Sequence, residues 1–127
     1  MEVWERRLAE ARRRAPKALD FDALLRSHQE RNEAMATRWR RDQPDSPYAV
    51  LEIRIFASGH SKRRLRRYRE MMTLDTRTPG LLVYRGALTL EWLTLTTVEI
   101  AAAAARAEVT DIDWTLLTVS EALAATP

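Results

Sequence analysis

Residues 48–57 read YAVLEIRIFA, and this stretch decides the fold because apolar and polar side chains alternate along it. The charged residues Glu52 and Arg54 fall on one face, and the apolar residues fall on the other. The apolar set is Leu51, Ile53, Ile55 and Ala57. Alternation with a period of two is typical of a β-strand that buries one face. The sequence therefore predicts a strand here, in a sheet with one covered side.

Two helices are predicted ahead of this strand. Apolar residues recur at helical spacing over residues 2–14 and again over residues 21–41. Pro16 ends the first helix, and Asp20 is placed to cap the start of the second. A turn-rich linker, DQPDSP, covers residues 42–47 and separates the helices from the strand.

The domain organisation follows from this linker. We expect residues 1–43 to form an N-terminal helical arm or hairpin and residues 44–127 to form a small α+β domain. At 127 residues the chain has room for one well-built core, so the two parts are expected to form one structural unit.

Beyond the strand, the pattern predicts a short helix, a β-hairpin, a second helix and a last segment of ambiguous pattern. These are residues 62–72, the hairpin strands 81–84 and 88–96, residues 98–107 and residues 111–125. If the last segment is a strand, the order is β-α-β-β-α-β, the ferredoxin-like arrangement with two helices on one face of an antiparallel sheet. If it is a helix, a three-stranded sheet carries a C-terminal αα hairpin. We favour the first because the preceding elements match and the turns are short.

The composition argues against a self-contained active site. The chain has no Cys, which excludes thiolate chemistry and Cys-based zinc sites, and its three glycines are too dispersed for a phosphate-binding loop. His28 and His60 have no metal-ligand context. Asp111 and Asp113 are interpreted as capping residues. The sequence predicts a protein that is not an enzyme and that holds no metal or cofactor.

His28 and Asn32 lie on the apolar stripe of the second predicted helix. We interpret them as a buried polar pair that fixes how the helices pack, in preference to a pair that faces a partner. The chain has no run of 18 apolar residues, and its first residues carry charge in place of a signal-peptide core. We therefore expect a cytoplasmic protein with no membrane partner.

Charge is distributed unevenly along the chain. Residues 1–69 contain 18 Lys and Arg against 10 Asp and Glu, while residues 70–127 contain 3 against 8. Six cations stand within residues 62–69, and we predict that they bind a polyanion such as a nucleic-acid backbone. They are Lys62, Arg63, Arg64, Arg66, Arg67 and Arg69. The competing interpretation is that the acidic half of the chain, or of a second copy, neutralises them.

A second functional hypothesis concerns the N-terminal helices. Their Trp and Arg residues are of the types that anchor protein interfaces. The candidate partner-binding residues are Trp4, Arg12, Arg13, Arg38, Trp39 and Arg41. On this hypothesis the chain is a protein-protein interaction module, such as an oligomer subunit, a viral structural component or an inhibitor, whose arginines meet acidic protein surfaces.

Overall fold

The computed structural model of the chain describes residues 3–46, 48–56, 81–109 and 111–117, which form an α+β fold. The elements follow the order α1 (Val3–Arg14), α2 (Phe21–Asp42), β1 (Ala49–Ile55), β2 (Leu81–Gly86), α4 (Leu90–Arg106) and β3 (Ile112–Leu117). The helices predicted before the linker and the strand that follows it are therefore confirmed. The oxygen Oδ1 of Asp20 accepts a hydrogen bond from the backbone N–H of Ala23, as expected of a capping residue.

Strand β1 lies at the centre of the sheet, with β2 and β3 antiparallel on either side of it. Since both outer strands run opposite to β1, they run parallel to each other, and α4 is the crossover that connects them. This is a split βαβ unit. Leu51 of β1 stands opposite Tyr84 of β2 and Leu116 of β3, which sets the register across the sheet.

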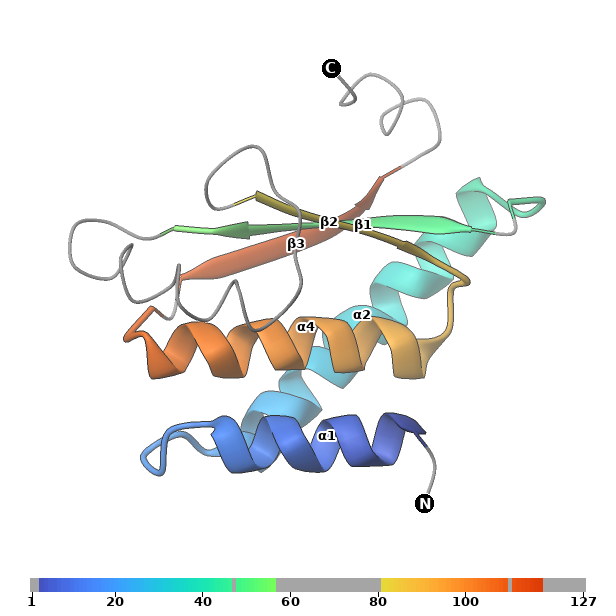
Figure 1. The fold of residues 1–127 in the computed structure, drawn as a ribbon. Helices are drawn as coiled ribbons and strands as arrows, with labels where there is room; N and C mark the ends of the chain where they lie inside the picture. The colour runs from blue at the N-terminus through green and yellow to red at the C-terminus, as the bar shows by residue number, and fades with distance from the viewer. Residues whose placement is uncertain (1–2, 47, 57–80, 110, 118–127) are drawn as a thin grey trace.

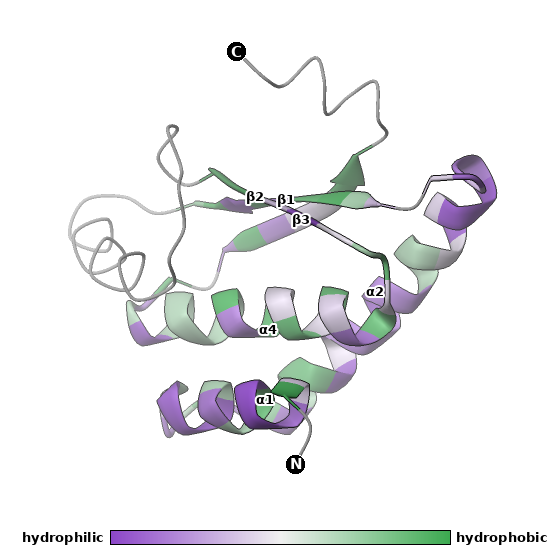
Figure 2. Ribbon diagram, turned by 45° about the vertical axis from the view of Figure 1, so that its right-hand side comes forward, coloured by the Kyte–Doolittle hydropathy of each residue, from purple (hydrophilic) through white to green (hydrophobic). Residues whose placement is uncertain are grey.

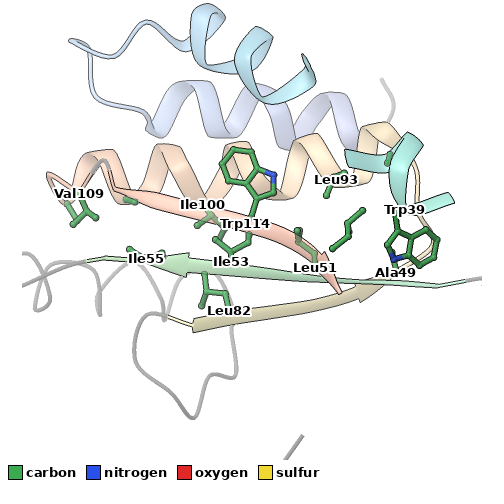
Figure 3. Packing of buried hydrophobic residues seen from close by; sticks show 14 residues of the cluster. Trp39, Ala49, Leu51, Ile53, Ile55, Leu82, Leu93, Ile100, Val109 and Trp114 are labelled. Carbon is green, nitrogen blue, oxygen red and sulfur yellow. The ribbon is translucent and has the colours of Figure 1, made fainter. Parts of the chain in front are cut away.

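Helix α4 is sandwiched between the sheet and α1, and α2 runs obliquely alongside it (Figure 1). Leu93 and Ile100 of α4 pack toward the sheet, in the core drawn in Figure 3. Val98 and Ala102 pack instead against Ala11 of α1. A helix in contact with neighbours on several sides is buried around most of its circumference. Accordingly, α4 carries apolar residues along its length, whereas α1 and the C-terminal end of α2 are mostly hydrophilic (Figure 2).

The predicted hairpin is wrong at its second strand. Residues 88–96 do not form a strand: Thr89 caps α4, which starts at Leu90 and continues through the helix that was predicted only from residue 98. The β-branched threonines of this stretch disfavour a helix in isolation, but tertiary packing overrides such propensities. The hydroxyl of Thr96 also bonds the carbonyl of Trp92 one turn earlier.

The described residues match neither of the two predicted sheets completely. The segment that begins at Ile112 is a strand, so a C-terminal helix over residues 112–117 is wrong. The four-stranded ferredoxin-like sheet is not found among the described residues, which contribute three strands. The helix predicted over residues 62–72 lies outside the described residues. No helix in the described ranges is long and apolar enough to cross a membrane.

The C-terminus of α4 contains a backbone position that favours glycine. Glu108 has a φ of 64°, and the N–H of Val109 bonds the carbonyl of Ala104, which together form a Schellman motif. A side chain in this left-handed region costs about 1 kcal/mol. The free energy of unfolding of Glu108→Gly is therefore expected to exceed that of Glu108→Ala by about 1 kcal/mol. Urea unfolding of the two variants measures the difference. Both variants lose the same carboxylate, so equal stability of the two would contradict the assignment.

Candidate functional site

All six predicted polyanion-binding residues, together with His60, lie outside the described residues. The described residues contain 14 Lys and Arg and 14 Asp and Glu, so their formal charge is zero. The other residues contain 7 basic and 4 acidic side chains, which accounts for the net charge of +3 of the whole chain. The excess positive charge therefore resides in the part of the sequence that contains the run 62–69.

The arginines of α1 that were predicted to meet a partner are paired with acids of the chain itself. Arg12 bonds Asp22 at 2.7 Å, and its guanidinium lies 4.7 Å from the centre of the Phe21 ring. Arg13 bonds Glu10 within the helix. These hydrogen bonds lower the pKa of the Asp22 and Glu10 carboxyl groups. Neither arginine is a free cation.

The predicted residues at the end of α2 divide into exposed and buried ones. Arg38 is exposed and has no ion pair with another described residue, while Arg41 lies 3.6 Å from Asp42. Trp39 is only 7% exposed and packs in the core against the sheet, and its indole N–H donates to the carbonyl of Leu117. We therefore assign Trp39 to the core.

Trp4 remains the exposed aromatic residue of the predicted docking set. It is 41% exposed and lines a cavity of about 150 Å³ between α1, α2 and the first two turns of α4. Leu8 and Leu95 contribute apolar walls to this cavity. Trp4 thus retains a surface that a partner can contact.

A buried polar network connects α2, α4 and β3. The indole N–H of Trp114 donates to Oδ1 of Asn32 at 2.7 Å. The Nδ2 group of Asn32 donates to the hydroxyls of Thr97 at 3.2 Å and Thr94 at 3.3 Å. Asn32 is fully buried, so these bonds replace those it makes to water in the unfolded chain. Both His28 and Asn32 are buried, as the sequence predicted.

His28 belongs to the same network. Its Nδ1 lies 2.9 Å from Oγ1 of Thr97, and its ring packs against that of Trp114, tilted by 32° with the ring centres 4.4 Å apart. Burial, together with the smaller effect of the nearby charge of Arg31, lowers the pKa of His28 to about 4. His28 is therefore neutral at pH 7.

Arg31 covers this network from the solvent side. It forms an ion pair with Asp113, donates to the carbonyl of Trp114 at 2.8 Å, and stacks its guanidinium 3.8 Å from the centre of the Trp114 ring. The bond to Arg31 lowers the pKa of the Asp113 carboxyl group. The sequence suggested that Asp113 caps a helix. That prediction is wrong, because Asp113 lies on strand β3 and pairs with Arg31 of α2.

Trp114→Phe is expected to destabilise the fold by about 2 kcal/mol, because it leaves Oδ1 of Asn32 buried without a donor. Urea unfolding followed by far-UV circular dichroism measures the change. Trp92→Phe is the matched control, since the indole N–H of Trp92 makes no hydrogen bond to another described residue. An equal loss in both variants would show that the hydrogen bond to Asn32 contributes nothing.

Three members of the network were missed from the sequence. Thr94 and Thr97 fell in or beside the stretch taken for a strand, and Trp114 was read only as an apolar residue. The spacing of three between Thr94 and Thr97 matches one face of a helix and was the available signal. Among the described residues, no cluster of three His, Asp or Glu side chains is arranged to hold a metal ion.

Comparisons with protein-family models, with curated proteins and with solved structures find no match to this chain. A function must therefore be argued from its own residues and their arrangement.

Proposed function

We propose that the chain is a non-catalytic accessory or assembly protein that binds a nucleic-acid backbone, or another polyanion, through residues 62–69. The observation that carries the proposal is the charge distribution. The described residues balance 14 cations with 14 acids, whereas residues 62–69 contain six cations and no acid. Such a concentration of like charge is unfavourable in isolation, and an anionic partner relieves it.

The ion pairs of the fold support this proposal over internal neutralisation. Several acids of the described residues already have arginine partners. Glu99 of α4 pairs with Arg7 of α1, and Asp113 of β3 pairs with Arg31 of α2. Glu52 of β1 bonds Arg54 on the same strand at 2.8 Å. These acids are therefore less able to satisfy residues 62–69.

The proposed binding is electrostatic and independent of base sequence. Contacts to phosphates position a protein on nucleic acid but carry no sequence information. Of the cations in residues 62–69, five are arginines, whose planar guanidinium suits two-point contacts to phosphate oxygens. The expected compartment, the cytoplasm, stays a prediction.

Two measurements on the purified chain test the proposal. The absorbance ratio at 260 and 280 nm reports nucleic acid carried through purification at low salt. Fluorescence anisotropy then compares two labelled 20-base-pair duplexes of unrelated sequence. The proposal predicts a raised ratio and affinities that agree within about threefold between the duplexes, since phosphate contacts do not read sequence. No binding to either duplex at 50 mM salt would overturn it.

A second candidate function is favoured by the sheet face that points away from the helices. Val83 on this face is 52% exposed, and Phe56, which continues the alternation of β1 past its end, is 54% exposed. Exposed apolar side chains on a sheet face are suited to protein contact. On this candidate, multi-angle light scattering shows a defined oligomer or heteromer with no nucleic acid, and Val83→Lys dissociates it. If the purified chain is monomeric at all concentrations tested, self-association through this face is excluded.

A further inference from the structure

The hydrogen bonds of the buried network assign the proton on His28. Because Oδ1 of Asn32 accepts from Trp114, the amide of Asn32 is oriented with Nδ2 toward Oγ1 of Thr97. The Thr97 hydroxyl donates its own hydrogen to the carbonyl of Thr94 at 3.2 Å. Oγ1 of Thr97 is then left to act as an acceptor toward the His28 ring.

Nδ1 of His28 lies 2.9 Å from this acceptor, so the proton is assigned to Nδ1. The other ring nitrogen, Nε2, carries a lone pair and has no hydrogen-bond partner among the described residues. His28 is buried, with 5% of the residue exposed. A buried acceptor without a donor is unfavourable, and structures rarely retain one without a reason.

His28 lines a cavity of about 310 Å³ between α2, the second half of α4 and the start of β3. Its walls are mainly apolar and include Leu24, Ala101, Ala105 and Val109. Because Ala101 and Ala105 have small side chains, they leave space in the cavity. Ser27 and Arg31, which are both exposed, lie at its rim.

We propose that this cavity binds a small, uncharged and largely apolar molecule with one O–H or N–H group, which donates to Nε2 of His28. The apolar walls favour the body of such a molecule, and one convergent polar group fixes its orientation. An anionic ligand fits less well because Arg31 is already engaged by Asp113, by the Trp114 carbonyl and by the Trp114 ring.

The protonation of His28 agrees with this assignment. Its pKa is lowered to about 4 by burial, so at pH 7 Nε2 is an acceptor and not a donor. The charged groups around it are Arg31 on its own helix and Asp113 on β3, which pair with each other. The described residues that line the cavity are a different set from residues 62–69, and phenol binding is measured separately from polyanion binding.

Phenol and anisole are the probes that test the site on the full chain. They have nearly the same shape, but only phenol has a donor. Titration followed by ¹H–¹⁵N NMR is expected to shift the amides of His28 and Ala101 with phenol, and anisole is expected to bind about tenfold more weakly, the usual cost of one hydrogen bond. Equal affinity for the two probes would overturn the proposal.

Ala101→Leu fills the cavity and is expected to abolish phenol binding. Ala34→Leu, on the exposed face of α2, is the matched control and keeps it. Phenol binding that survives Ala101→Leu with unchanged affinity would show that the cavity is not the site. The wild-type comparison of the two probes holds even if Ala101→Leu does not fold. A ¹⁵N spectrum of His28 with its proton on Nε2 would also contradict the assignment.

Discussion

Replacement of Arg63, Arg64 and Arg67 by Gln is expected to weaken binding to duplex DNA about 500-fold at 0.1 M salt. Each phosphate contact contributes roughly eightfold at that salt relative to 1 M, because it releases a condensed counterion, and three contacts multiply to this value. Fluorescence anisotropy with a labelled 20-base-pair duplex measures the change. Thermal unfolding of the variant checks that the fold is unaffected.

The matched control replaces Arg12, Arg13 and Arg14 of α1 by Gln, which changes the net charge of the chain by the same amount. Arg12 is paired with Asp22, and Arg13 and Arg14 are paired with Glu10. The control is therefore expected to weaken binding by less than about threefold, as charges away from the contact are screened by salt. Equal losses in the two triple variants would show that affinity follows net charge and not residues 62–69.

Acidification from pH 7 to pH 4 is expected to destabilise the fold by about 3 kcal/mol through His28 alone. In the unfolded chain His28 takes up a proton near its ordinary pKa of 6.5, whereas in the folded chain burial lowers that pKa to about 4. Between these values the unfolded state binds more protons, so stability falls as the pH falls. Each unit of difference corresponds to about 1.4 kcal/mol.

Urea unfolding at pH 7, 6, 5 and 4 measures this effect. His28→Gln is expected to remove most of the loss, although the variant is less stable at every pH. His60→Gln removes the other histidine of the chain and is expected to keep the loss, which makes it the matched control. Wild-type protein that is equally stable at pH 7 and pH 5 would contradict the buried, neutral state of His28.

Elements with a clear periodicity were predictable from the sequence. Helices α1 and α2 and strand β1 each bury one side, so their apolar residues repeat at the period of the element. Strand β3 was predicted as one of two alternatives. Helix α4 was misread at its start because it is buried on several sides, and its threonines weaken the helical pattern. That environment is set by the sheet and by α1, which are distant in sequence.

The polar network was predictable only in part. His28 and Asn32 stand on an apolar stripe, which is enough to indicate that they are buried. Their partners Thr97 and Trp114 lie 65 or more residues further along the chain, and no local pattern connects them. Trp39 was predicted at an interface but lies in the core. An aromatic residue next to arginines is compatible with either place, so the sequence alone did not distinguish them.

The dependence of DNA affinity on salt tests the central claim most directly. The observed binding constant of the wild-type chain for a 20-base-pair duplex is measured from 50 to 400 mM NaCl. If all six cations of residues 62–69 contact phosphates, a plot of log K against log salt has a slope of about −5, at about 0.9 per contact. A slope between zero and about −1 would contradict the proposal that these residues form a polyanion-binding surface.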